Sequence, residues 1–561
     1  MASNERRLAI TVKGGVSLGA YEAGAITEVL RLVAYNNAQP GATAWYIDTV
    51  AGASAGSITG AMLGRALTNA ADVVNLHNVW VNDISVDLMT ANARSNNTIL
   101  DSNSVWNLAM KYFANKIAQA KPHPALRPGG ERIGMVYTLS ALGIDPVTIL
   151  AANRTLSYYE YAATGDFSIT VKPDASVEYS GAMIAPWGHQ ANDRGSITGD
   201  DAYIAMLKAA VTSGAFPIAF APRGLAFWEN NNWRNEYFVD GGVYDNDPVG
   251  ESINLAHDID WGPGGEAYED SDRRFLIIHT EPLPTAQPWP PDGVVRTEVL
   301  DLSPLMFLRE FLPGFVEESK TSGLRGIAAV NRKIAEREEL LSDLCYMINT
   351  MATSSDFAGL TRSFEVVVAA LARRRQIDSD RLELIRKYFV DDLKGLSGSL
   401  FDRASRLEDV RRNAFIEIGL LVDLVANLAD KVLFEPIVVA PPEALDGNAV
   451  YGFSGFFLQE IREHDFQCGI ADAYRAFADM NDPNFKLDPN APVRPDSILP
   501  LSDDLQQRYD ASNKIFDDRV ADVVTQAATD IIGLPFKIPF IGSAAKTALD
   551  GLIRMILENF L

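Results

Sequence analysis

A serine between small residues is the first feature of this chain that could do chemistry. Ser54 is flanked at two residues' distance by Gly52 and Gly56, which fits the pattern G-x-S-x-G. In that pattern the small neighbours let a strand turn sharply into a helix and hold the hydroxyl clear of its own backbone. Residues 45–50 are rich in aromatic and β-branched side chains, and residues 57–63 suit a helix packed close to a sheet. The context therefore predicts a strand, a turn at Ser54 and a helix, as expected around a serine nucleophile.

A carboxylate far along the chain is the candidate partner of this serine. Asp240 ends the strand-like residues 236–239 and is followed by two glycines. A free aspartate has a pKa of about 3.9, but burial beside a hydroxyl raises it toward a value useful for accepting a proton. By itself Asp-Gly-Gly is also an ordinary turn. Asp245 and Asp247 are alternative bases that the sequence does not exclude.

Residues 12–21, near the amino terminus, contain a glycine turn between a predicted strand and a predicted helix. Consecutive backbone N–H groups and the positive end of a helix dipole can face an anion there. In acyl transfer that anion is the tetrahedral oxyanion, and losing one donor costs about 3 kcal/mol of transition-state stabilisation. The alternative is a phosphate loop, but the turn lacks the Gly-Lys-Ser/Thr ending of a nucleotide loop and the spacing of a dinucleotide fingerprint.

Two further segments bear on the site. Residues 212–222 are small and apolar with interspersed prolines, and we interpret them as a packed loop. His279 ends a strand-like run and follows Asp240, so Ser54, Asp240 and His279 have the chain order of an α/β-hydrolase triad, which is an alternative to a two-residue site. The other histidines show no metal-ligand spacing, so we expect neither a metal nor a cofactor.

Taken in chain order, four segments resemble the patatin-like phospholipase family: residues 12–21, 52–56, 212–222 and 236–248. Members of this family combine a glycine-rich oxyanion loop, G-x-S-x-G and D-G-G/A. The resemblance covers about the first half of the chain. It implies a three-layer α/β/α sandwich and a serine acyl hydrolase that cleaves lipid esters, as a phospholipase A or lysophospholipase does, without a catalytic histidine. It also implies Ser54 as nucleophile, Asp240 as base and the N–H groups of Gly14, Gly15 and Val16 as oxyanion donors.

The chain departs from the family pattern in the oxyanion loop. Val16 stands where the family has a third glycine, and Leu18 stands in place of a basic residue. Lys13 is a candidate to supply that charge from the other side of the turn. The departure motivates a second hypothesis, a weakly active or inactive lipid-binding or scaffold protein with the same fold. Residues 451–469 resemble a segment found late in large bacterial patatin-like proteins, and we interpret them as packing between domains.

Composition limits the class of protein and its partners. Hydrophobic residues make up 47% and charged residues 22%, which is typical of a globular chain, and the net charge of −24 argues against nucleic acid as a partner. The only cysteines, Cys345 and Cys468, are too few for a disulfide framework. The amino terminus lacks a signal-peptide core, and no apolar run approaches the roughly 18 residues of a membrane span. We expect a cytoplasmic protein whose membrane contact, if any, is peripheral.

The distribution of residue patterns predicts two domains. Strand-like and helix-like segments alternate in residues 1–285, which indicates a sheet covered by helices, with residues 155–198 as an insertion over the site. A proline-rich stretch at 282–293 indicates a domain boundary. Beyond it, charged amphipathic stretches predict a mainly helical domain over 286–561. An amphipathic segment at 545–560 suits docking onto the protein or a second copy in a homo-oligomer, with transient membrane contact as the alternative.

Overall fold

The structure is a computed structural model, and it describes most of the chain. The described residues are 5–91, 93, 98–143, 147–151, 154–158, 161–182, 184–186, 195–217, 219–229, 232–261, 272–283, 331–333, 337, 340–350, 357–374, 377, 379, 382–383, 385–387, 407–426, 436–450, 452–496 and 498–532. The chain divides into two compact units. The first combines residues 1–323 with 436–561, and the second is 324–435.

The first unit is built on a mixed sheet, in which the described residues form eleven strands. The strands are β1 (Glu5–Val12), β2 (Ala44–Gly52), β3 (Glu131–Ala141), β6 (Ala162–Val171), β7 (Val177–Ala182), β8 (Ala185–Pro186), β9 (Ser196–Thr198), β10 (Arg223–Glu229), β11 (Asn232–Asp240), β12 (Asp272–Ile278) and β13 (Ile437–Val439). Their order is β13-β12-β1-β2-β3-β6-β7-β9, with β11 joining β10 to β3 and β8 pairing with β6. A separate hairpin joins β4 (Val147–Ala151) to β5 (Arg154–Tyr158). The strands from β13 to β3 are parallel, and the remaining pairings are antiparallel.

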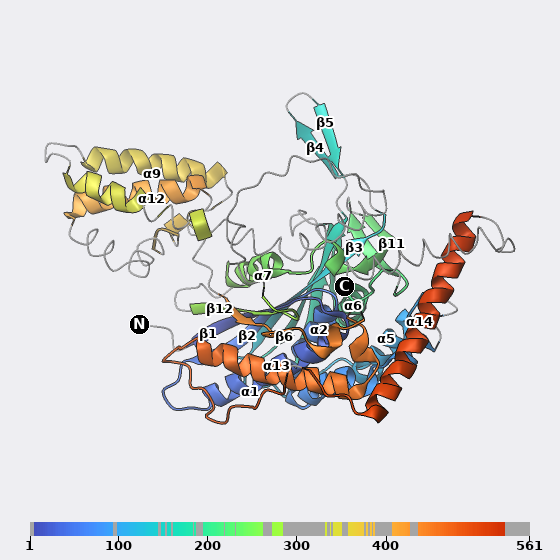
Figure 1. Ribbon diagram of the computed structural model, residues 1–561. Coiled ribbons are helices and arrows are strands. Elements are labelled where there is room, and N and C mark those ends of the chain that lie inside the picture. Colours follow the sequence, from blue (N-terminus) through green and yellow to red (C-terminus); the bar gives the residue numbers. More distant parts are fainter. Residues whose placement is uncertain are drawn as a thin grey trace, which may run out of the picture. The chain divides into compact units, whose positions relative to one another are not determined.

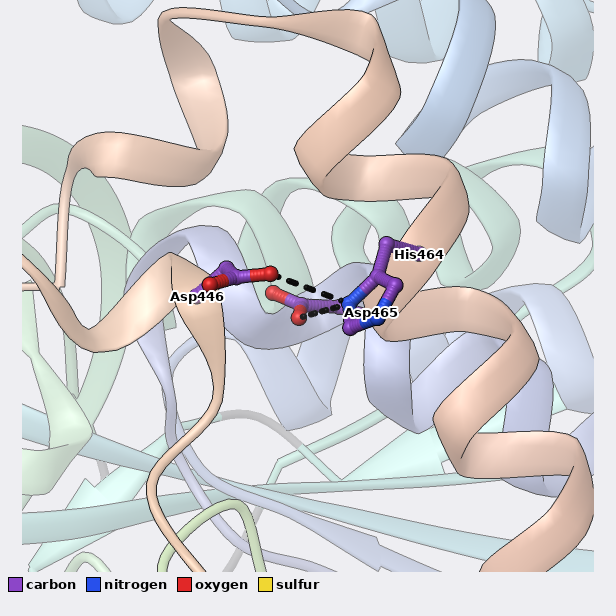
Figure 2. A group of neighbouring side chains, drawn as sticks. All are labelled: Asp446, His464 and Asp465. Atoms are coloured by element: carbon purple, nitrogen blue, oxygen red, sulfur yellow. Dashed lines mark ion pairs between the residues drawn. The ribbon is translucent and has the colours of Figure 1, made fainter. Parts of the chain in front are cut away.

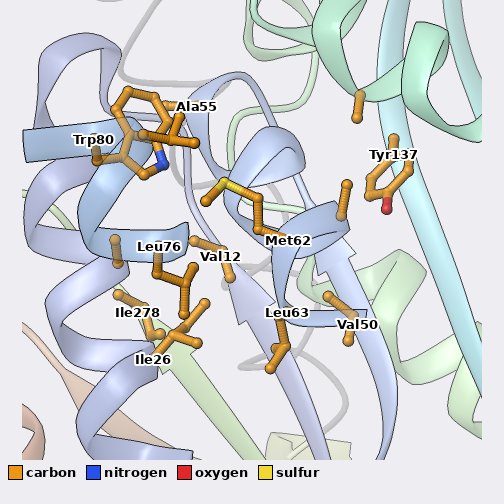
Figure 3. Packing of buried hydrophobic residues seen from close by; sticks show 14 of the residues in the cluster. Val12, Ile26, Val50, Ala55, Met62, Leu63, Leu76, Trp80, Tyr137 and Ile278 are labelled. Carbon is orange, nitrogen blue, oxygen red and sulfur yellow. The ribbon is translucent and has the colours of Figure 1, made fainter. Parts of the chain in front are cut away.

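Helices cover both faces of the sheet (Figure 1). Helices α1 (Gly19–Asn37), α2 (Ala55–Thr68) and α6 (Gly199–Ser213) lie on one face, and α7 (Val249–Trp261) lies on the other. Strand β1 is hydrophobic on both faces because both are covered, so Leu8, Ala9 and Ile10 are fully buried. Figure 3 shows part of the core between the sheet and α1 and α2, including Ile26 from α1 and Ile278 from β12. The predicted α/β sandwich is confirmed.

Shorter elements complete the described part of the first unit. They are η1 (Val16–Leu18), η2 (Ala70–Val73), α3 (Val74–His77), the π-helical turn η3 (Asn78–Asp83), α4 (Val86–Thr90), α5 (Ser102–Phe113), η6 (Gly241–Val243), η7 (Asp446–Asn448) and η8 (Ser454–Phe456). Helix α14 (Asp503–Ile532) follows near the carboxyl end of the described chain. The segment at 545–560 lies outside the described residues.

The sequence prediction of an insertion at 155–198 is wrong for much of that region. Strand β6 pairs with β3 along ten residues, from Glu131↔Val171 to Ser140↔Ala162, and β7 pairs with β6 in turn. Among the described residues, Gly165 and Asp166 belong to β6, and residues 172–176 form the short turn between β6 and β7. Antiparallel strands such as these keep polar residues because one face need not be buried, and glycines make room for a large neighbour. A side chain at Gly181 would collide with Phe167.

The carboxyl-terminal residues do not form one domain with the preceding helices, as the boundary at 285 predicted. Helix α13 (Gln459–Asp479) packs along α1 (Figure 1). Strand β13 extends the sheet beside β12. The two helices approach closely through glycines: a Cβ on Gly24 would lie 2.0 Å from Phe466 O, and one on Gly469 would lie 2.1 Å from Tyr21 O. An amphipathic pattern shows that a helix has an apolar face but not what that face packs against.

The second unit is helical, as predicted for that stretch. Helices α9 (Phe357–Arg374) and α12 (Asp409–Ala426) pack around a separate apolar core that includes Val368, Ala414 and Phe415. The charged amphipathic pattern therefore identified the helices correctly here. Within the described part of the chain, no helix is both long enough and apolar enough to cross a membrane.

Candidate active site

The sheet topology brings Ser54 and Asp240 together. Strand β2 runs parallel to β3 and its last residue, Gly52, pairs with Tyr137. Strand β11 runs antiparallel to β3 and its last residue, Asp240, pairs with Leu139. Both strands lie on the same edge of β3 and run toward each other, so they end two β3 positions apart. The turn after Gly52 therefore places Ser54 opposite Asp240.

The turn at Ser54 requires its two glycines for close approach. A Cβ on Gly52 would lie 2.5 Å from Gly56 O, and a Cβ on Gly56 would lie 2.3 Å from Val12 O at the end of β1. Ser54 itself has φ 51° and ψ −126°, a conformation that a residue with a side chain rarely adopts. Strain of this kind costs about 1–3 kcal/mol and is typical of functional sites. The predicted strand–turn–helix is therefore present, with the serine at its strained centre.

The two predicted site residues are in direct contact. Ser54 Oγ donates a 2.6 Å hydrogen bond to Asp240 Oδ2, and the Gly242 N–H donates a 2.7 Å hydrogen bond to Asp240 Oδ1. Asp240 is 2% exposed and Ser54 7%. Burial raises the pKa of Asp240 to about 7, although the hydrogen bonds from Ser54 and Gly242 act in the opposite direction. The carboxylate is therefore a much stronger base than an exposed aspartate.

A third segment, predicted only as a packed loop, supports both site residues. The Ser54 N–H donates to Ser213 Oγ at 2.9 Å, and Ser57 Oγ donates to the same atom at 2.8 Å. The Asp240 N–H donates to Ala215 O at 3.0 Å. Sequence reasoning missed Ser213. The available signal was a serine at the start of a small-residue segment that lies, in chain order, between the two motifs.

The predicted oxyanion loop lies against the serine. A Cβ on Gly14 would lie 2.7 Å from Ser54 Cβ, so a side chain there would displace Ser54. The Gly14 N–H, predicted as an oxyanion donor, already donates to Asn246 O at 3.4 Å. Among the described residues, the N–H groups of Gly15 and Val16 have no acceptor. These two groups remain as candidate donors.

The departure from the family's glycine pattern has a structural consequence at Val16. This residue has φ 51°, in the left-handed region that glycine adopts freely and a β-branched residue avoids. The cost for an L-residue is roughly 1–2 kcal/mol. Leu18 is 2% exposed, and its N–H closes the turn onto Gly15 O at 2.8 Å. The backbone of the loop thus keeps a left-handed conformation typical of glycine, although the residue at that position is a valine.

Lys13 lies among buried acids. Its side chain is 6% exposed, and its charge lowers the pKa values of Asp245 and Asp247. Burial dominates at both acids and raises their pKa values to about 7 and about 6. Lys13 therefore acts as a counter-charge for this acidic pair, next to the loop that it precedes. Of the three aspartates considered from sequence, Asp240 is the one that contacts Ser54.

His279 belongs to the surroundings of the site but not to the contact between Ser54 and Asp240. Neither residue has the His279 ring as a hydrogen-bond partner within the described part of the chain. Burial, with a smaller contribution from Lys13, lowers the pKa of His279 to about 3. The ring is therefore neutral at ordinary pH.

One group of side chains among the described residues has the composition of a metal site: Asp446, His464 and Asp465 (Figure 2). His464 Nδ1 lies 3.0 Å from Asp446 Oδ2 and 3.8 Å from Asp465 Oδ1, and its Nε2 lies 2.6 Å from Asp496 O. Both ring nitrogens thus face oxygen acceptors, and the two carboxylates raise the pKa of His464 to about 9. We interpret the group as a protonated histidine held by two aspartates.

A small apolar cavity, about 30 Å³, lies beside α2. Three of its lining residues, Ile58, Ala61 and Met62, are on the helix that begins directly after Ser54. Trp80 and Leu207 contribute to the remaining wall. Apolar surface is therefore available within two turns of the candidate nucleophile.

The fold and the site define this part of the chain as an α/β domain with a serine on a strained strand-to-helix turn, paired with a buried aspartate. Residues 10–253 match the family model described as patatin-like phospholipase, and this region is a patatin-like phospholipase domain, of a family of lipid acyl hydrolases. A search of curated proteins found no significant match. The family match contains Ser54 and Asp240 and ends before residues 436–561.

Proposed function

We propose that the protein is a serine acyl hydrolase that cleaves lipid esters with Ser54 as nucleophile and Asp240 as general base. The observation that carries this proposal is the 2.6 Å hydrogen bond from Ser54 Oγ to Asp240 Oδ2. The base is buried and its pKa is raised to about 7, which suits proton transfer near neutral pH. The match to the patatin-like phospholipase family supports the same assignment.

The mechanism follows from these contacts. Asp240 accepts the Ser54 proton while Oγ attacks the ester carbonyl carbon, and the N–H groups of Gly15 and Val16 stabilise the oxyanion. The protonated Asp240 then returns the proton to the leaving alcohol, which leaves an acyl ester on Ser54. A water molecule, deprotonated by Asp240, attacks the carbonyl carbon of this ester. The bond to Ser54 Oγ then breaks, Asp240 returns the proton to Oγ, and the carboxylic acid is released.

The proposed substrate is a lipid ester of the phospholipase A or lysophospholipase type. The family supports a lipid substrate, and the cavity beside α2 supplies apolar surface on the helix that follows Ser54. The cavity is small, at about 30 Å³. An acyl chain would therefore have to displace flexible side chains such as Met62.

The test is covalent labelling with a fluorophosphonate probe, followed by assays on a panel of phospholipids, lysophospholipids and triglycerides. Wild type should label and hydrolyse esters, and Ser54→Ala should do neither while remaining folded. Ser252→Ala is the matched control, because Ser252 is a buried serine whose hydroxyl has no hydrogen-bond partner among the described residues. Labelling that persists in Ser54→Ala would assign the nucleophile elsewhere.

A second candidate function is lipid binding without turnover, as a scaffold with the same fold. The strained Val16 in the oxyanion loop favours it, since the loop departs from the glycine that the conformation suits. A folded wild-type protein that binds lipid vesicles but neither labels nor hydrolyses would support this candidate and exclude the hydrolase.

A further inference from the structure

We propose that Ser17 and a segment from the carboxyl-terminal part of the chain, residues 446–450 and 452–456, position the oxyanion loop. This inference rests on the proposed hydrolase function. The segment lies outside the matched family region of residues 10–253, and within the described structure it contacts the loop directly. Ser17 is a positioning residue, because it acts through its neighbour Val16 and not on the reacting atoms.

Three hydrogen bonds join Ser17 to residues more than 400 positions away. The Ser17 N–H donates to Gly452 O at 3.2 Å. Ser17 Oγ donates to Gly447 O at 3.3 Å and accepts from the Gly455 N–H at 3.2 Å. Ser17 is 1% exposed, so these contacts are made away from water. Its backbone and side chain are thus both held by one segment.

These bonds act on the candidate oxyanion donor because Ser17 follows Val16 directly. A fixed Ser17 amide restricts the ψ rotation of Val16, which has an unfavourable φ of 51°. A Cβ on Gly452 would lie 3.6 Å from Val16 Cβ, so the same segment also packs over the valine side chain. A strained conformation persists only where its surroundings over-determine it. The segment supplies that constraint in a loop without the family's third glycine.

The segment is itself fixed to α13. Asp465 Oδ2 accepts the Gly447 N–H at 2.9 Å, and Arg462 Nη1 donates to Gly455 O at 2.8 Å. Asp446 is paired with His464, as Figure 2 shows. The two glycines that bond to Ser17 Oγ are therefore both tied to α13: Gly447 through its N–H and Gly455 through its carbonyl oxygen. Rigid support of this kind is needed to hold oxyanion donors in place.

Two variants test the proposal from opposite sides of the contact. Ser17→Ala removes both hydrogen bonds of the hydroxyl. Gly455→Ala displaces Ser17 by a steric clash instead, because the new Cβ would lie 2.5 Å from Ser17 Oγ and 2.9 Å from Ser17 Cβ. Each should lower kcat on a soluble ester by about tenfold and leave KM unchanged, which is the signature of a lost transition-state interaction.

A matched glycine provides the control. Gly250→Ala adds the same methyl group on α7, where nothing lies within 4 Å of the new Cβ, and it should keep wild-type kcat and KM. The double variant with Ser17→Ala and Gly455→Ala should lose less than the product of the two single losses. The first substitution removes the hydroxyl with which the second collides, so the two effects are coupled.

Amide hydrogen exchange gives a readout that does not depend on turnover. In Ser17→Ala, peptides covering residues 13–20 should exchange faster than in wild type, while peptides from β2 should not change. Unchanged loop exchange together with wild-type kcat would overturn the proposal. A lower kcat accompanied by a higher KM and a lower melting temperature would also overturn it, since that pattern indicates a purely structural role. A wild-type protein without hydrolysis would instead refute the proposed function, and this inference with it.

Discussion

Ser54 Oγ lies 2.6 Å from Asp240 Oδ2 although 186 positions separate the two residues. Their meeting depends on β3, on which the ends of β2 and β11 pair at Tyr137 and Leu139. The contact is therefore a property of strand register, and a one-residue slip of β11 would turn Asp240 to the opposite face of the sheet.

The raised pKa of Asp240 predicts the pH dependence of acylation. The base works only when it is ionised, and its pKa is about 7. We expect kcat/KM for ester hydrolysis to rise with pH up to about 7 and then to level off. Asp240→Asn should lower kcat/KM by about 10²–10⁴-fold, the usual contribution of a general base.

The control for this profile is Asp245→Asn. Asp245 is also buried and burial raises its pKa to about 7, but the Ser54 hydroxyl donates its hydrogen bond to Asp240 and not to Asp245. The variant should keep the wild-type pH profile. A profile that disappears in Asp245→Asn and persists in Asp240→Asn would identify Asp245 as the base instead.

The same raised pKa predicts that Asp240 destabilises the fold at neutral and alkaline pH. Its folded-state pKa of about 7 exceeds the ordinary value of 3.8, so folding favours the protonated form. The stabilising contribution is complete below pH 3.8 and is lost as pH rises through about 7. Asp240→Asn should therefore gain stability relative to wild type between pH 5 and 8. Urea unfolding of both proteins at pH 5 and at pH 8 measures this gain. If the difference in unfolding free energy between the variant and wild type were the same at both pH values, the raised pKa would be contradicted.

The strained backbone of Ser54 predicts a stability difference between two inactive variants. Ser54→Ala and Ser54→Gly both lose the hydroxyl, but only glycine relaxes at φ 51°. We expect Ser54→Gly to be more stable than Ser54→Ala by about 1 kcal/mol, within the range for a strained φ. Chemical denaturation of the two variants tests this. A less stable glycine variant would show that the turn is not strained.

The buried position of Lys13 predicts a pH-dependent loss of stability in Lys13→Met. At pH 5 Asp245 and Asp247 are largely protonated, because burial raises their pKa values to about 7 and about 6. At pH 8 both are ionised and need the counter-charge. The variant should lose stability at pH 8, where the buried carboxylates lose a nearby positive charge, and much less at pH 5. Equal losses at the two pH values would indicate a packing effect alone.

His279 distinguishes a two-residue site from a triad. Its ring forms no hydrogen bond with Ser54 or Asp240 within the described structure, so His279→Gln should keep its turnover rate within a few-fold of wild type. Steady-state kinetics with a check of folding by circular dichroism measures this. A folded variant that turns over about a thousandfold more slowly than wild type would favour the triad.

The sequence by itself indicated the chemistry of Ser54 and Asp240 and the α/β class. These features are local: a sharp strand-to-helix turn needs small residues at Gly52 and Gly56, and buried parallel strands need hydrophobic runs such as that of β1. Local steric needs leave a pattern in adjacent residues, and such patterns can be read without a structure.

Only the tertiary structure decided which distant segments meet. It placed Ser213 against the backbone of Ser54, put β6 and β7 into the sheet in place of an insertion, and joined residues 436–561 to the first unit. It also brought Gly447 and Gly455 to Ser17. Backbone carbonyls and N–H groups make these contacts, and every residue type carries them, so no pattern of side chains identifies the partners. Register and packing, which depend on the whole fold, select them.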